Sequence, residues 1–265
     1  MYKPDFFVRH NNKTGYKQLL LQLVNMMIRL LGLLSIVFIL GLSSCKKNND
    51  APVSTKRDSL MMINASTDTV NLYLNGTRLN NNSDLAPGIA AGYYSAPFGA
   101  QAFQVKKKFN PITSIVQPLF TVTYPADGHP YHSLFIVDET QANAFFTVDT
   151  LAFLVDTSTI NTTCYVRFVN ASVDAGSLDF AANSTKFSNQ AFKTGSGFKP
   201  VVVSSNTDTL TTINVYHAGQ TTPIISVKYS LIPGNAYTFW TQGKLNGTGN
   251  LIFSVGTTLN SNYQL

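Results

Sequence analysis

The stretch Met62-Ile63-Asn64-Ala65-Ser66-Thr67-Asp68 decides the fold, because the chain repeats it 106 positions later as Phe168-Val169-Asn170-Ala171-Ser172-Val173-Asp174. Each copy precedes a run of alternating apolar and polar residues, Val70–Leu74 and Leu178–Phe180, which is the period of a half-buried β-strand. Two later landmarks repeat at nearly the same offset, which indicates a duplicated domain of about 100 residues. These landmarks are Ala91-Gly92-Tyr93 with Ser196-Gly197-Phe198, and residues 131–137 with residues 236–242.

Apolar and polar residues alternate through most of the chain after residue 58, and the strand-like runs are rich in Val, Ile, Thr, Tyr and Phe. Turn-forming pairs such as Asn75-Gly76 and Pro233-Gly234 separate these runs, and no sustained helical period interrupts them. We therefore expect an all-β fold. The repeat divides it into two tandem antiparallel β-sandwich domains, residues 59–157 and 162–265.

The second copy, taken with the strand before it, resembles the opening of a known family. Residues 165–174 look like the first signature of the domain-of-unknown-function family numbered 4397. Its members have a strand, an Asn/His-Ala-Ser-x-Asp turn and a second alternating strand, which here is residues 177–180 and, in the first copy, residues 70–73. Neither copy has the usual proline after the turn serine. The resemblance covers roughly residues 60–265 and implies immunoglobulin-like β-sandwiches in an envelope lipoprotein of diderm bacteria, with no established activity.

The N-terminal part has the pattern of an export signal. The apolar run Ile28–Leu42 is shorter than the roughly twenty residues that a membrane-spanning helix needs, and it suits a signal peptide. Ser43-Ser44-Cys45 follows it and resembles the lipobox of bacterial lipoproteins. That resemblance implies a signal peptide over residues 1–44, cleavage before Cys45 and a lipid on its sulfur. The alternative is an uncleaved anchor helix that ends in an ordinary cysteine.

Two further expectations concern this region. Met26 or Met27 offers a simpler start than Met1, because Arg29 and the apolar run follow at once. Residues 45–58 are polar, contain a proline and lack aromatic residues, so we expect a flexible tether between Cys45 and the first sandwich. No Asp follows Cys45 directly, which favours the outer membrane, on its periplasmic face or the cell surface, over inner-membrane retention.

The charge does not favour a nucleic-acid partner. The formal net charge of +6 falls to about +2 once residues 1–44 are removed, because that segment holds five Lys or Arg and one Asp. Lys106-Lys107-Lys108 is the one basic cluster, without interleaved aromatic residues, and we interpret it as a strand end that blocks edge pairing. We expect a membrane partner through the lipid on Cys45, and a glycan or envelope protein as a further partner.

The repeated turns have a structural interpretation and a functional one. The side-chain oxygens of serine and aspartate can accept backbone N–H groups two residues on and so fix a corner between strands. The alternative is a cation site, but each turn offers one carboxylate and calcium needs six to eight oxygens. We favour structural turns, formed by Asn64, Ser66, Asp68, Asn170, Ser172 and Asp174.

Residues that could carry chemistry are few. Cys164 starts a strand-like run and is expected to be a small buried hydrophobe, and His129 and His132 are expected to be solvated loop residues. No nucleophile, metal or phosphate-binding motif is present, so we expect no enzyme activity, no cofactor and no metal. Asp58-Ser59-Leu60 resembles an O-glycosylation acceptor, which makes Ser59 a candidate for modification.

The function that fits these features best is a non-enzymatic lipoprotein whose two β-sandwiches serve binding or envelope assembly. A passive spacer subunit is the first alternative, and a hydrolase of envelope polymers is the second. Aromatic residues on sandwich surfaces can stack on sugars, although most aromatic residues in alternating strands belong to the core. The aromatic candidates are Tyr93, Tyr94, Phe98, Tyr131 and Trp240.

Overall fold

The computed structural model describes Lys17 and residues 21–28, 57–80, 83–108, 118–151, 161–203 and 210–262. Residues 21–28 are helical. Within these ranges, no helix is long and apolar enough to cross a membrane. Cys45, most of the predicted signal peptide and the tether up to residue 56 lie outside the described residues.

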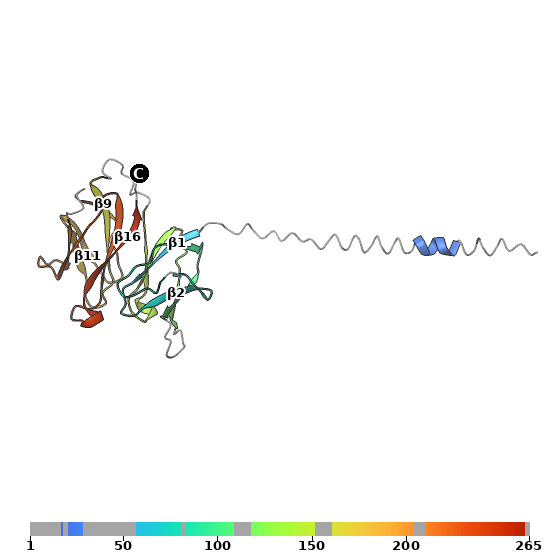
Figure 1. Cartoon of the computed structure of the whole chain (residues 1–265), viewed down its shortest axis with the longest axis horizontal. Coiled ribbons are helices and arrows are strands. Elements are labelled where there is room, and N and C mark those ends of the chain that lie inside the picture. The colour runs from blue at the N-terminus through green and yellow to red at the C-terminus, as the bar shows by residue number, and fades with distance from the viewer. Residues whose placement is uncertain are drawn as a thin grey trace, which may run out of the picture. The chain divides into compact units, whose positions relative to one another are not determined.

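The first module contains two four-stranded sheets, with strand orders β4-β1-β7-β8 and β3-β2-β5-β6. Figure 1 labels one strand of each sheet, β1 and β2. Its first strand begins at Arg57, so Arg57 and Asp58 belong to the sandwich and not to the predicted tether. The elements are β1 (Arg57–Asn64), β2 (Val70–Leu74), β3 (Thr77–Arg78), β4 (Tyr94–Pro97), β5 (Ala102–Lys107), β6 (Pro118–Thr123), β7 (Tyr131–Ile136), the 3-10 turn η1 (Gln141–Asn143) and β8 (Phe145–Val148).

The second module repeats this arrangement strand for strand. Its sheets have the orders β12-β9-β15-β16 and β11-β10-β13-β14, which are the orders of the first module with every number raised by eight. The all-β fold and the β-sandwich architecture are therefore confirmed. The elements are β9 (Thr163–Asn170), β10 (Leu178–Ala182), β11 (Thr185–Gln190), β12 (Lys199–Val202), β13 (Thr211–His217), β14 (Ile225–Tyr229), β15 (Asn235–Gln242), the 3-10 turn η2 (Gly249–Leu251) and β16 (Ser254–Asn262).

One strand pair in each module departs from the antiparallel pairing that we expect for these sandwiches. The first and seventh strands of each module run parallel, with Met62 opposite Leu134 and Phe168 opposite Phe239. Alternation along a strand shows which face is buried, but it carries no information about the direction of the neighbouring strand. Parallel pairing is possible here because the chain crosses to the other sheet between these strands.

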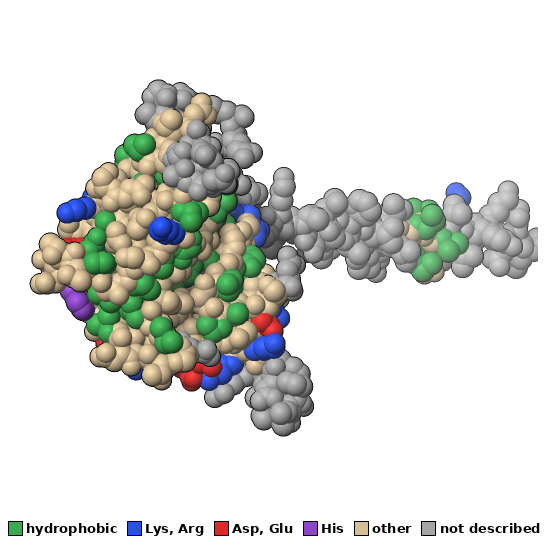
Figure 2. Space-filling view, turned by 60° about the vertical axis from the view of Figure 1, so that its left-hand side comes forward, with side chains coloured by type: hydrophobic (Ala, Val, Ile, Leu, Met, Phe, Trp, Pro, Cys, Tyr) green, Lys and Arg blue, Asp and Glu red, His purple; other side chains and the backbone are tan. Residues whose placement is uncertain are grey.

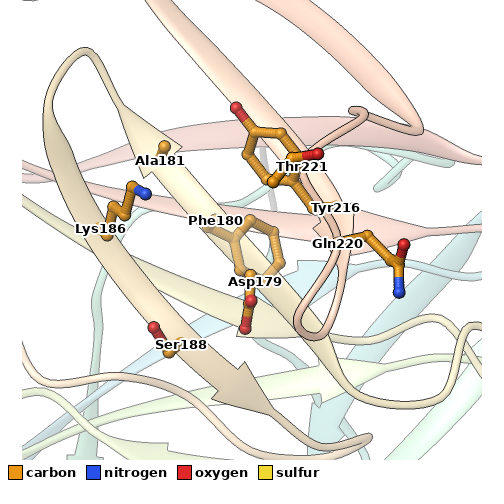
Figure 3. A pocket seen from close by; sticks show the side chains of 8 residues that line it. All are labelled: Asp179, Phe180, Ala181, Lys186, Ser188, Tyr216, Gln220 and Thr221. Carbon is orange, nitrogen blue, oxygen red and sulfur yellow. The ribbon is translucent and has the colours of Figure 1, made fainter.

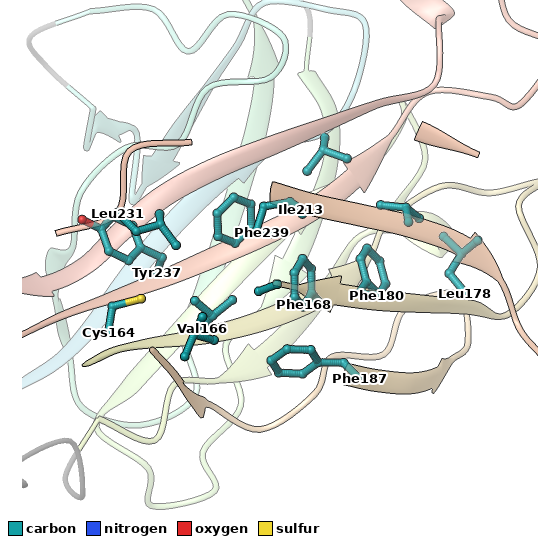
Figure 4. Close-up of a cluster of buried hydrophobic side chains, with 14 of the residues drawn as sticks. Cys164, Val166, Phe168, Leu178, Phe180, Phe187, Ile213, Leu231, Tyr237 and Phe239 are labelled. Atoms are coloured by element: carbon teal, nitrogen blue, oxygen red, sulfur yellow. The ribbon is translucent and has the colours of Figure 1, made fainter. Parts of the chain in front are cut away.

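Each module encloses its own apolar core between its two sheets. In the first module, Leu60 and Met62 of β1 point into a core that also contains Phe103. In the second module, Phe168 lies at the centre of the core and stacks on Phe180 and Phe239, at ring-centroid distances of 4.4 and 5.4 Å (Figure 4). Cys164 is wholly buried in this core, as expected, and burial raises its pKa to about 12.

A third apolar cluster joins the two modules. Met61 and Ile63 on the opposite face of β1 pack with Phe135, Val169 and Trp240 from β7, β9 and β15. The sheets that contain the parallel pairs are thus buried on both faces, as parallel strands generally are. The described residues of the two modules therefore form four stacked sheets, with an apolar layer between each neighbouring pair. We call the central layer, with the polar side chains described below, the module junction.

Candidate binding surfaces around the module junction

The corner after β1 is held by Asn64. Its side-chain oxygen accepts hydrogen bonds from the backbone N–H of Ser66, at 3.0 Å, and from the Ser66 hydroxyl. Its amide donates to the carbonyls of Asp68 at 2.7 Å and Leu85 at 2.9 Å. Asp68 does not cap this turn with its side chain but pairs with Lys107 of β5, 3.4 Å away. The asparagine, which the sequence analysis treated as one turn residue among three, is the centre of the corner.

The corner after β9 has the same centre. Asn170 accepts the N–H of Ser172 at 3.1 Å and donates to the carbonyls of Gly176 and Gln190, at 2.7 and 3.0 Å. Asp174 reaches another loop, where its carboxylate accepts the N–H of Leu245 at 3.2 Å. The corners tie neighbouring loops together at one end of each module. Within the described residues, no group of three or more His, Cys, Asp or Glu side chains is arranged to hold a metal ion.

The module junction contains a buried ion pair that the sequence analysis missed. The guanidinium of Arg167, on β9, lies 2.6 Å from the carboxylate of Asp149, which follows β8 in the first module. Arg167 also donates to the Val148 carbonyl at 3.0 Å and to the Ser133 hydroxyl at 3.2 Å. Ser133 in turn donates to Asp149 at 2.6 Å, so the buried carboxylate is bound from several sides.

The ion pair is one link in a closed ring of hydrogen bonds. Arg167 donates to the Thr238 hydroxyl at 2.7 Å, and Thr238 donates to Asn260 at 2.6 Å. Asn260 donates to the Tyr93 hydroxyl at 2.9 Å, and Tyr93 donates to Asp149. Burial and then the negative charge of Asp149 raise the pKa of Tyr93, so this tyrosine is a neutral donor at any physiological pH.

One signal in the sequence could have revealed this pair. Arg167 stands within the apolar run of residues 164–169, and a charged residue in a strand buried on both faces must have a partner. The partner itself comes from the other module and lies in no recognisable motif.

A groove of about 220 Å³ opens at the end of the module junction where both corners lie. The first module contributes Thr67, Asp138 and Asn143, and the second contributes Val173, Lys244 and Leu251. The strands β1, β7, β9 and β15 all end at this groove. We call it the distal groove, because it lies at the end of β1 that is farther from Arg57, where the chain enters the first module. Although burial acts to raise it, hydrogen bonds from Asn143 and Thr140 hold the pKa of Asp138 below its usual value.

The structure places one aromatic binding candidate, Trp240, and one histidine, His132, differently from the expectation. Trp240 is wholly buried in the module junction, so it cannot stack on a sugar, whereas Phe98 and Tyr131 are exposed at their surfaces. His132 is not a solvated loop residue: it lies in β7 with 1 % of its surface exposed. Its ring nitrogens contact the Tyr124 hydroxyl at 2.7 Å and Asp127 at 3.1 Å.

The basic cluster and the modification candidate also lie inside sheets. Lys106 and Lys107 belong to β5, which pairs with β2 and β6, so they do not protect a sheet edge. Ser59 lies in β1, paired with Ser95 of β4 and Tyr131 of β7, and the preceding Asp58 is buried. Figure 2 shows that one face of the molecule carries apolar side chains with few charged ones among them.

Comparison with known proteins gives one match to a family and several distant structural likenesses. No curated protein matches the chain. Candidate cell adhesion proteins from Bacteroides eggerthii and Bacteroides fragilis are each 8% identical to it, with a TM-score of 0.22. The alignments cover 78% and 76% of this chain and 96% and 86% of theirs. Identity and TM-score are both too low to transfer a fold or a role, so neither is taken from these proteins.

The family comparison concerns the first module, together with the first strands of the second module. It matches the family described as "Domain of unknown function (DUF4397)" over residues 59–181. This range begins in β1, includes both corners and ends in β10. The resemblance inferred from the repeated turns is thereby confirmed, and residues 59–181 carry the DUF4397 pattern.

Proposed function

We propose that this chain is a non-enzymatic lipoprotein of the bacterial envelope that holds two fused β-sandwiches away from a membrane for binding. The observation that carries the proposal is the position of the distal groove relative to Arg57. The predicted tether joins the sandwich at Arg57, where β1 begins, and the groove lies where β1 ends. A strand of this length separates the two by roughly 25 Å, at about 3.3 Å per residue.

The module junction joins the two sandwiches into one rigid unit. Separating the modules would expose Trp240 and Met61 to water and would leave the charges of Arg167 and Asp149 unpaired. Both costs oppose hinge motion between the modules. A ligand in the distal groove would therefore meet a preformed surface built from both modules.

Anchoring is tested by the Cys45→Ala variant of the full chain. The wild type is expected in the detergent phase after phase partition and in the outer-membrane fraction, since acylation of the Cys45 sulfur would provide the anchor. The variant is expected in the aqueous phase. Equal partition of both proteins into detergent would contradict the proposal.

Binding is distinguished from a passive spacer role by photo-crosslinking in intact cells. A photoreactive residue at Leu251, in the distal groove, is expected to give one discrete adduct. The same residue at Leu259 is the matched control, because Leu259 is also exposed but lies on β16, away from the groove. A spacer would give no discrete adduct at either position, and that outcome would favour the alternative function.

A further inference from the structure

The outermost sheet of the second module carries a hollow of about 130 Å³ on the face that points away from its core (Figure 3). Ala181 of β10 forms part of its floor, and its small side chain gives the hollow its depth. Lys186 and Ser188 of β11 lie on one side, and Tyr216 of β13 lies on the other. Gln220 and Thr221, from the loop after β13, line the hollow on the same side as Tyr216.

The walls of this hollow are fixed by Asp179. One oxygen of its carboxylate accepts the N–H of Asn189 at 2.6 Å, and the other accepts the N–H of Gly219 at 2.8 Å. Asn189 and Gly219 both have positive φ angles, of 56° and 78°. Asn189 lies where the pairing of β11 with β10 shifts register, and Gly219 lies in the turn after β13. The carboxylate therefore ties β11 and the loop after β13 to β10, and the hollow exists without a ligand.

The lining has the chemistry of a site for an uncharged polyhydroxylated ring. The half-buried ring of Tyr216 offers an apolar surface with a polar end. Lys186 and Gln220 supply donors, and the hydroxyls of Ser188 and Thr221 both donate and accept. The lining contains one positive charge, on Lys186, and one negative charge, on Asp179, so it favours neither an anion nor a cation.

The first module shows that its own chain covers the equivalent position. Asn71 and Lys106 form the strand pair that corresponds to Asp179 and Tyr216. There, Asn80 donates to Asn71 at 2.7 Å, and Asn71 donates to Asp84 at 3.0 Å. Asn71 and Asn80 are both buried, so the loop after β3 covers this face of the sheet, and its polar side chains bond with Asn71. In the second module the same face is hollow.

We propose that the hollow at Tyr216 binds one neutral hexopyranose unit of a glycan. This inference rests on the proposed function as a binding protein and names the class of one ligand. The sugar ring lies against Tyr216 over Ala181, and its hydroxyl groups bond with Lys186, Gln220 and Asp179. The site takes a single ring, because the hollow measures only about 130 Å³.

The test uses the detergent-solubilised full chain and a panel of neutral disaccharides: maltose, cellobiose, lactose and chitobiose. Saturation-transfer NMR detects binding, and titration calorimetry measures the affinity. Glucuronic acid and glucosamine serve as anionic and cationic probes. We expect at least one neutral disaccharide to bind and neither charged sugar to bind more tightly than it.

Two variants localise the binding, and a third controls for general effects. Tyr216→Ala removes the stacking surface, and Ala181→Leu fills the hollow, so each should weaken binding at least about tenfold. Lys106→Ala, at the position in the first module that corresponds to Tyr216, should bind as the wild type does. The fluorescence of Trp240, the single tryptophan, reports whether each variant is folded.

The outcomes separate this inference from the proposed function. Absence of binding to every neutral disaccharide, or binding that both hollow variants retain, would overturn the sugar site. Tighter binding of a charged sugar would overturn the claim of a neutral ligand. None of these results bears on the anchoring and crosslinking experiments, which test the lipoprotein and binding roles at Cys45 and Leu251.

Discussion

Arg167 and Asp149 form an ion pair across the two modules, 2.6 Å apart, with 2 % and 0 % of their side chains exposed. The pair lies beside an apolar layer. Its hydrogen-bond partners are hydroxyls and the Val148 carbonyl, and the Arg167 guanidinium also lies over the Phe198 ring, 4.9 Å from its centroid. Removing water from two charges costs free energy, and this cost offsets much of their attraction. Such a pair therefore contributes more to the specificity of the packing between the modules than to the net free energy of folding. Its position makes the module junction specific for one arrangement of the two sandwiches.

The first prediction concerns this pair. Arg167→Ala leaves the Asp149 carboxylate buried without its cation and should lower the free energy of unfolding by about 3–5 kcal/mol, measured by urea titration. The double variant Arg167→Met with Asp149→Leu should recover much of that loss, because no unpaired charge remains. Lys108→Ala is the control: its pair with Asp84 is exposed and should contribute less than about 1 kcal/mol. Equal effects of Arg167→Ala and Lys108→Ala would contradict the role assigned to the junction.

The second prediction concerns the close approach of Trp240 to the backbone of β16. A Cβ atom added at Gly256 would lie 2.3 Å from a ring carbon of the Trp240 indole, which is rigidly buried. Gly256→Ala should therefore destabilise the protein by about 3 kcal/mol and shift the tryptophan emission. Gly197→Ala is the matched control, because a Cβ there meets nothing within 4 Å. A melting temperature shared by both variants would show that the indole can move aside.

The repeat of Asn64 and Asn170 made the duplication predictable, and with it the strand content and the two sandwiches. An asparagine that must bond with four backbone or hydroxyl partners tolerates little substitution, so the same short turn marks the same corner in both modules. The strand direction was not predictable. Residues 60–63 are all apolar and indicate burial on both faces, but this pattern fits a parallel and an antiparallel neighbour equally.

The module junction was beyond sequence reasoning for a different reason. Arg167 signals a buried partner, yet the choice of Asp149 depends on how two separate sheets pack, which no local pattern records. The same holds for the hollow at Tyr216. The small side chain of Ala181 gives the hollow its depth. The hollow is open because no loop covers it in the way that the loop after β3 covers the equivalent face of the first module. Periodicity identified the strands, and tertiary packing decided which of their polar residues meet.

The third prediction concerns the corners. Asn170→Ala removes hydrogen bonds to Ser172, Gly176, Gln190 and Thr241 from a wholly buried position. The partners left unsatisfied should cost about 2–3 kcal/mol of unfolding free energy, and Asn64→Ala should cost a similar amount. Asn214→Ala is the control, since this half-buried asparagine bonds only with Ser226 among the described hydrogen bonds. A corner variant as stable as Asn214→Ala would mean that water replaces the lost bonds.

The last prediction concerns alkaline pH and follows from Cys164. Burial raises the pKa of its thiol from 9.0 to about 12, so the folded protein keeps a proton that the unfolded chain releases at lower pH. A group whose folded pKa is raised contributes stability that is fully present below the unfolded pKa and is lost as the pH increases. The free energy of unfolding should therefore fall between about pH 9 and pH 12. Urea titrations at intervals across this range measure the slope.

The Cys164→Ala variant isolates the thiol from the tyrosines. Tyr93 and Tyr124, whose pKa values are also raised by burial, would begin to contribute to the same loss only near pH 10. Between about pH 9 and pH 10 the variant should show a flatter slope than the wild type, although removal of the sulfur lowers its stability at neutral pH. Parallel curves for the two proteins in that interval would mean that the thiol does not stay protonated in the folded state, and that Cys164 is less isolated from water than its position in the core requires.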